Sequence, residues 1–118
     1  MEDCIFCKII RGEIPCDKVL ENVNFLAFLD NRPFTNGHTL VVPKKHYRWV
    51  YDIENFEDYW SFTRQVTLKL KSSLNPEFIT YFTMGNEVPH AHVHVIPRYP
   101  NDVLVGLFAE SLRSSLSP

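Results

Sequence analysis

The segment PHAHVHVIPR, residues 89–98, places three histidines in alternation with small or β-branched apolar residues. Successive side chains of a β-strand point to opposite faces of its sheet. We therefore expect a strand over residues 91–97 whose one face carries the rings of His90, His92 and His94. The apolar residues between the histidines then face the other way, into the protein core.

A structural role for these histidines is the alternative, because a single histidine in a strand is usually just a packed or hydrogen-bonded residue. Three imidazoles on one face, however, repel one another when protonated and need polar partners when buried. Each ring can donate or accept a hydrogen bond, or attack an electrophile, near neutral pH. The alternation therefore favours a chemical role over a purely structural one.

The composition is that of one globular domain over residues 1–118, with 45% hydrophobic residues and a formal net charge of −2. Duplex nucleic acid calls for a basic protein face, so we expect no such partner. No apolar run reaches the roughly 18 residues of a membrane-spanning helix, and we expect no membrane contact. The first residues, MED, lack the pattern of a signal peptide, which favours a cytoplasmic location.

The pattern along the chain predicts an α+β fold with one antiparallel sheet. Short connections favour antiparallel pairing, and one long helix is expected to cover one face of the sheet. The expected elements are a short helix at 4–11, strands at 18–22, 25–30 and 38–43, a long helix at 55–73, strands at 78–84 and 91–97, and a helix at 102–113.

The long helix begins after Asn55, which is a good N-cap residue. Apolar side chains recur along it at spacings of three and four, which predicts one buried face. The residues expected on that face are Phe56, Tyr59, Trp60, Phe62, Thr63, Val66 and Leu70.

Four sequence blocks together resemble the histidine triad (HIT) family of nucleotide hydrolases and transferases. Besides residues 89–98 they are NGHTLVVPKKH at 36–46, CIFCKIIRGEIP at 4–15, and the strand at 25–30. The block at 4–15 is similar to that of the bacterial-type branch related to the Hint nucleoside phosphoramidases. The resemblance implies a five-stranded antiparallel sheet with one long helix and short flanking helices, and a homodimer that joins two sheets.

The resemblance also implies an enzyme that breaks the bond from the α-phosphorus of a nucleoside phosphate to a leaving group. It places the nucleophile at His92, with His94 and His38 as donors to the phosphate oxygens or the leaving group. A neutral imidazole that attacks phosphorus forms a covalent nucleotidyl intermediate and divides one hard displacement into two. The other ring nitrogen of His92 then needs an acceptor, for which we expect a backbone carbonyl.

Three further residues are expected at the substrate. Asp30 matches the acid that contacts the ribose in relatives, although a turn-forming role at the strand end is the alternative. Phe6 and Ile10 are expected to border the base, with core packing as the alternative for both.

The loop before the histidines departs from the family pattern. Relatives often have Gly-Gln-Ser/Thr-Val where this chain has GNEV at 85–88. Asn86 retains an amide with a shorter reach and is expected to bind substrate. Glu87 replaces a hydroxyl that helps the leaving group in relatives. A carboxylate there would orient an amine leaving group or repel a polyphosphate, and the sequence leaves its role open.

Cys4 and Cys7 form a C-x-x-C pair, a spacing found in both redox and zinc sites. Some bacterial-type HIT proteins bind zinc through this pair, the histidine after Pro-Lys-Lys and the first histidine of the triad. The resemblance places those last two ligands at His46 and His90. Two thiolates and two imidazoles make a closed, structural zinc site, and free thiols are the alternative.

Several functions stay open at this point. The leading one is hydrolysis of nucleoside 5′-phosphoramidates or adenylates through a nucleotidyl-His92 intermediate. The alternatives are a dinucleoside polyphosphate hydrolase, a nucleotide-binding interaction module with incidental turnover, and a metal-binding scaffold. The sequence fixes neither the base, nor the leaving group, nor the pathway.

Overall fold

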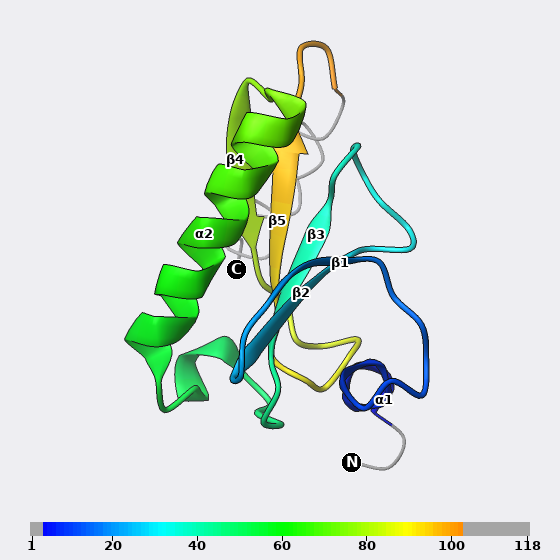
Figure 1. Cartoon of the computed structure of the whole chain (residues 1–118), viewed down its shortest axis with the longest axis vertical. Helices are drawn as coiled ribbons and strands as arrows, with labels where there is room; N and C mark the ends of the chain where they lie inside the picture. Colours follow the sequence, from blue (N-terminus) through cyan, green and yellow to red (C-terminus); the bar gives the residue numbers. More distant parts are fainter. Residues whose placement is uncertain (1–3, 103–118) are drawn as a thin grey trace, which may run out of the picture.

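A computed structural model describes residues 4–102 of the chain (Figure 1). Its elements are α1 (Ile5–Ile10), β1 (Lys18–Glu21), β2 (Phe25–Leu29), β3 (Thr39–Pro43), the 3-10 turn η1 (Val50–Asp52), α2 (Phe56–Leu74), β4 (Phe78–Phe82) and β5 (Val93–Arg98). The predicted elements are confirmed within a few residues at their ends, and η1 was not predicted. The helix expected at 102–113 falls on residues that, beyond Asp102, lie outside the described part.

The five strands form one sheet in the order β1-β2-β3-β5-β4, and every neighbouring pair is antiparallel. This confirms the α+β prediction. β3 and β5 lie side by side near the centre of the sheet. The sequence blocks at 36–46 and 89–98 therefore meet, although they are far apart in sequence. β4 is an edge strand, and so is β1.

Apolar side chains cover both faces of the sheet. Val41, Val93 and Val95 point to the face that α2 covers, where they join a core with Tyr59 and Phe62. On the opposite face, Leu40 and Val42 pack with residues of α1. Figure 1 shows α2 running along one side of the sheet and the short α1 on the other side. Alternate side chains of β3 therefore pack toward α2 on one face of the sheet and toward α1 on the other.

The long helix α2 follows the predicted bounds. It ends at Asn75, whose φ of 50° is left-handed and stops the helix. Asn55 occupies the N-cap position, but its side chain makes no capping hydrogen bond. Phe56 was wrongly expected in the buried face and is 42% exposed. Phe56 points in the direction of the buried face but is the first residue of α2, at the end of that face, and its ring meets that of Trp60 edge-on.

The histidine strand begins later than expected. β5 starts at Val93, so His90 and His92 precede the sheet ladder. The backbone N–H of Ala91 donates to the carbonyl of Tyr47 at 2.7 Å instead of to a neighbouring strand. The side-chain alternation nevertheless continues, because Ala91 joins Val93 and Val95 in the core under α2. Within residues 4–102, no helix is long and apolar enough to cross a membrane.

Candidate active site and metal cluster

A cavity of about 620 Å³ opens on the α1 side of the sheet. His92 and His94 line it together with the carboxylates of Asp30 and Glu87 and the amide of Asn86. His92 is only 5% exposed, and the cavity is where its ring meets the outside. The middle histidine therefore lies at a deep opening rather than sealed in the core.

The His92 ring has a defined tautomer. Its Nδ1 lies 2.7 Å from the backbone carbonyl of His90. Because a carbonyl only accepts, Nδ1 carries the proton and Nε2 keeps a lone pair. Burial lowers the pKa of His92 below its usual value, which keeps the ring neutral near pH 7. The expected backbone acceptor is confirmed, and the ring keeps an unprotonated Nε2.

His38 and His94 form a second set of fixed tautomers. The backbone N–H of Phe34 donates to His38 Nδ1 at 3.0 Å, so the His38 proton is on Nε2. That Nε2–H donates to His94 Nδ1 at 2.8 Å, which leaves the His94 proton on its own Nε2. Burial lowers the pKa of both rings, that of His94 to about 4. His94 therefore offers an N–H donor, whereas His92 offers a lone pair.

His38 does not reach the cavity itself. Its side chain is fully buried and is not part of the lining, and the Phe34 ring stacks on it with centroids 5.2 Å apart. His38 directly precedes β3, and its Nε2–H is directed at His94 on the neighbouring strand β5. The expected contact of His38 with a phosphate oxygen or the leaving group stays a prediction.

Asp30 forms a turn and also reaches the cavity, while its contact with a ribose stays a prediction. Its Oδ1 accepts the backbone N–H of Arg32 at 2.9 Å, as a turn-forming aspartate does. Its side chain also lines the cavity, with Oδ2 3.6 Å from His38 Nε2. Asp30, His38 and His94 are close enough to suggest a metal site. Their hydrogen bonds argue against one, because neither nitrogen of His38 has a lone pair to offer.

The apolar part of the cavity comes largely from α1. Phe6 lines it, and its ring meets the His92 ring edge-on with centroids 5.1 Å apart. Ile10, which was expected at the base, is not in the lining, and Ile5 and Ile9 are. Phe6 and Ile10 are also four residues apart, so helical spacing alone does not separate Ile10 from the residues that line the cavity. Ile10 is the last residue of α1 and packs against the apolar cluster that contains Phe6 and Leu40. Ile5 and Ile9 were not expected at the cavity from the sequence.

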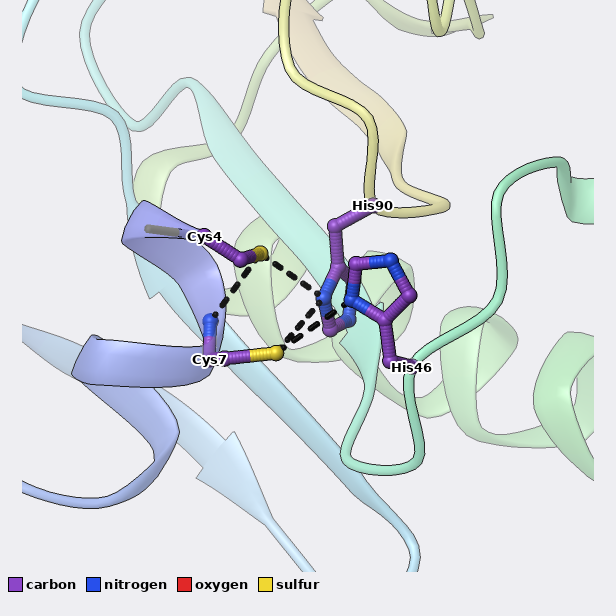
Figure 2. A group of neighbouring side chains, drawn as sticks. All are labelled: Cys4, Cys7, His46 and His90. Carbon is purple, nitrogen blue, oxygen red and sulfur yellow. Dashed lines mark hydrogen bonds between the residues drawn. The ribbon is translucent and has the colours of Figure 1, made fainter. Parts of the chain in front are cut away.

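Cys4, Cys7, His46 and His90 come together beside this cavity (Figure 2). Cys7 Sγ lies 3.3 Å from His46 Nδ1 and 3.5 Å from His90 Nδ1, and Cys4 Sγ lies 3.4 Å from His90 Nδ1. Ligand atoms of a tetrahedral zinc ion, with bonds of about 2.3 Å to sulfur and 2.0 Å to nitrogen, lie about 3.5 Å apart. The four side chains already have the spacing of such a site.

The protonation of the cluster also fits a metal ion. His90 Nε2 donates to the carbonyl of Pro43 at 2.8 Å, so Nδ1 turns a lone pair toward the sulfurs. Burial lowers the pKa of His90 to about 4, and it lowers that of His46 as well. Burial and the neighbouring Cys4 raise the pKa of Cys7 to about 11, so a nearby cation is needed to hold its thiolate.

The HIT domain profile matches residues 11–101 of this chain. The chain belongs to the HIT family. Cys4 and Cys7 lie just before the matched range, so the cluster of two cysteines and two histidines joins this N-terminal segment to the HIT domain.

Three similar proteins illustrate the family. An uncharacterised HIT-like protein of Methanocaldococcus jannaschii is 42% identical over 91% of this chain and 88% of its own length. The adenosine 5′-monophosphoramidase of Schizosaccharomyces pombe is 38% identical over 84% of this chain and 76% of its own length. The crystal structure of a zinc-bound histidine triad family protein from Mycobacterium smegmatis superposes with a TM-score of 0.73, at 32% identity, over 87% of this chain and 80% of its own.

Proposed function

We propose that this HIT protein is a nucleotide hydrolase that cleaves the α-phosphate bond of nucleoside 5′-phosphoramidates or adenylates. The observation that carries the proposal is the neutral His92 ring at the cavity, with Nδ1–H held by the His90 carbonyl at 2.7 Å. A lone pair in a fixed position is what nucleophilic attack on phosphorus requires. The phosphoramidase relative supports the substrate class.

In the proposed reaction, His92 Nε2 attacks the α-phosphorus as the bond to the leaving group breaks. A nucleotidyl-His92 intermediate forms, and the departing nitrogen takes a proton from solvent, which the later hydrolysis of the intermediate returns. His94 Nε2–H donates a hydrogen bond on the same face to a phosphate oxygen or the leaving group and keeps its proton, and His38 orients the His94 ring through the 2.8 Å hydrogen bond. Water then cleaves the P–N bond to His92 and releases the nucleoside monophosphate, which frees the enzyme for another turnover.

The cavity lining suggests how the nucleoside is held. Ile5, Phe6 and Ile9 provide an apolar wall for the base, and Asp30 is placed to accept hydrogen bonds from ribose hydroxyls. Asn86 is positioned at the same cavity for an amide contact with the phosphate or the leaving group. Ile10 is replaced by Ile9 in this assignment.

The carboxylate of Glu87 favours one leaving-group class over another. It shares the lining with Asp30, and its charge acts on His92. Two carboxylates at the cavity repel the extra negative charges of a polyphosphate and attract an amine. Phosphoramidates are therefore the preferred substrates, with dinucleoside polyphosphate hydrolysis and an interaction module with incidental turnover as the alternatives.

We further propose that the four-residue cluster holds zinc in a structural role. Cys4, Cys7, His46 and His90 would fill all four positions of a tetrahedron and leave none open for a substrate. The zinc-bound relative from M. smegmatis supports the metal. Zinc would fasten the N-terminal segment to the sheet. The cytoplasmic location and the absence of a duplex nucleic acid partner stay predictions.

The experiment compares the wild-type protein with His92→Asn on adenosine 5′-phosphoramidate and on diadenosine polyphosphates. The wild type is expected to cleave the phosphoramidate faster, and the variant is expected to lose at least about 10³-fold in kcat, as nucleophile removal does in other enzymes. Binding of AMP, measured by calorimetry, should persist in the variant.

Mass spectrometry of the rapidly quenched wild-type reaction should find the nucleotide on the peptide that contains His92. Turnover by His92→Asn near the wild-type rate would refute the assignment of the nucleophile. Faster cleavage of the diadenosine polyphosphates would instead favour the alternative substrate class.

A further inference from the structure

His90 takes part in two groups of contacts: its ring lies in the cluster with Cys4 and Cys7, and its backbone carbonyl accepts a hydrogen bond from His92. Its ring Nδ1 lies 3.4 Å from Cys4 Sγ and 3.5 Å from Cys7 Sγ. Its backbone carbonyl accepts the proton of His92 Nδ1 at 2.7 Å. Ring and carbonyl belong to one residue, so an ion that fixes the ring also restrains the direction of the carbonyl.

α1 is a second connection between the cluster and the cavity. Cys4 is its N-cap and Cys7 lies within it, while Ile5, Phe6 and Ile9 line the cavity. A helix of six residues is not stable alone and depends on its anchoring to the rest of the protein. Whatever holds the two sulfurs therefore also holds the apolar wall.

We propose that the metal centre positions the nucleotide site, through the carbonyl of His90 and through α1. His90 is in this sense a positioning residue that acts through His92. The proposal rests on the proposed nucleotide hydrolase function and on a metal ion at the cluster. Its consequence is reciprocal: metal binding strengthens nucleotide binding, and nucleotide binding strengthens metal binding by the same factor.

The competing explanation is that packing and backbone hydrogen bonds hold both parts without the ion. Phe6 packs with Leu26, Phe28 and Leu40 on the sheet. The backbone N–H of His90 donates to the Val88 carbonyl at 2.8 Å. If these contacts suffice, removing the metal leaves nucleotide binding and the His92 tautomer unchanged.

His46→Ala separates the two explanations. His46 is the one cluster member that lies neither on α1 nor next to His92, and it does not line the cavity. AMP affinity is expected to fall at least about fivefold in this variant and in wild-type protein stripped of zinc. His46→Cys, which supplies a thiolate ligand, should restore it, and Lys45→Ala, at the exposed neighbouring residue, should bind AMP as the wild type does.

The zinc affinity of the wild type, measured by chelator competition, should be higher with saturating AMP than without AMP. The factor of this increase should equal the factor by which zinc increases the affinity for AMP. Nitrogen NMR of the His92 ring should show the Nδ1–H tautomer alone with zinc and a mixture of tautomers without it. A metal that only fastens α1 would not change that tautomer. Backbone amide spectra of the five strands check that each variant is folded. If His46→Ala is unfolded, the zinc and AMP affinities of the wild type alone decide between the two explanations.

AMP that binds equally tightly with and without zinc, with zinc affinity unmoved by AMP, would overturn the coupling and leave the hydrolase proposal standing. AMP that fails to bind zinc-loaded wild type would instead refute the proposed nucleotide function. Protein that takes up no zinc would overturn both the metal assignment and the coupling.

Discussion

At the scale of single residues, hydrogen bonds to carbonyls and backbone amides determine which nitrogen of each histidine carries the proton. His92 is fixed by the carbonyl of His90, and His38 by the amide of Phe34. His94 takes its tautomer from His38. Three chemically identical side chains thus acquire different tautomers from backbone groups and from one another.

The pH dependence of stability tests this arrangement at His94. Burial, with repulsion from His92 and His38 and an opposing effect of Asp30, lowers the pKa of His94 from 6.5 to about 4. Between these values the unfolded chain binds a proton that the folded ring does not. The contribution of His94 is therefore fully present above pH 6.5 and is lost as the pH falls toward 4.

Urea unfolding gives the free energy of unfolding at each pH between 7 and 4.5. Its slope against pH should be smaller in His94→Gln than in the wild type, by an amount that corresponds to up to about one bound proton. Zinc content, measured at each pH, should be the same in both proteins, so that release of the metal does not contribute to the difference. Equal slopes in the two proteins would show that His94 is not a buried neutral ring.

At the scale of elements, α1 offers a matched pair of variants. Ile9 and Ile10 are adjacent, both half-buried and both packed against the same apolar cluster, but only Ile9 lines the cavity. Ile9→Ala should weaken AMP binding about fourfold, since the contact that half-buried Ile9 makes with the base is taken as about one buried methylene, or about 0.8 kcal/mol. Ile10→Ala should change the dissociation constant less than twofold. AMP binding is measured by calorimetry. A larger loss of affinity in Ile10→Ala than in Ile9→Ala would show that Ile10 contacts the base, as first expected from the sequence.

The elements that could be predicted from sequence are those with a long, regular pattern. The alternation in residues 90–95 correctly placed Ala91, Val93 and Val95 in the core, and the spacing of apolar residues in α2 correctly predicted the length of that helix. In a six-residue helix the phase is ambiguous by one residue, which is why Ile10 was expected in place of Ile9. The start of β5 depends on the carbonyl of Tyr47, a contact across the fold that no local pattern contains.

At the scale of the whole molecule, the homodimer stays a prediction, and the edge of the sheet within residues 4–102 is the surface considered for it. β4 is an edge strand, and its residues Phe78 and Tyr81 are 48% and 46% exposed. An apolar edge strand is a ready surface for pairing with a second chain. We propose this edge for the dimer contact, and the predicted assembly would join the two sheets there.

Phe78→Glu should convert a dimer of twice the chain mass into a monomer, as measured by light scattering after size exclusion. Val23→Glu is the matched control, because Val23 is 84% exposed and lies between β1 and β2, away from β4. A wild-type protein that runs as a monomer at micromolar concentration would refute the dimer, and a dimer that survives Phe78→Glu would move its contact elsewhere.

The late start of β5 has a further meaning for anyone who would redesign this protein. A carbonyl engaged in a sheet ladder has its lone pair directed at the next strand, whereas that of His90 meets the ring of His92. Extending the β3–β5 pairing by three residues, back to His90, would add ladder hydrogen bonds to the sheet. It would also engage the oxygen that accepts the proton of His92 Nδ1, so under the proposed function the longer sheet would lower turnover.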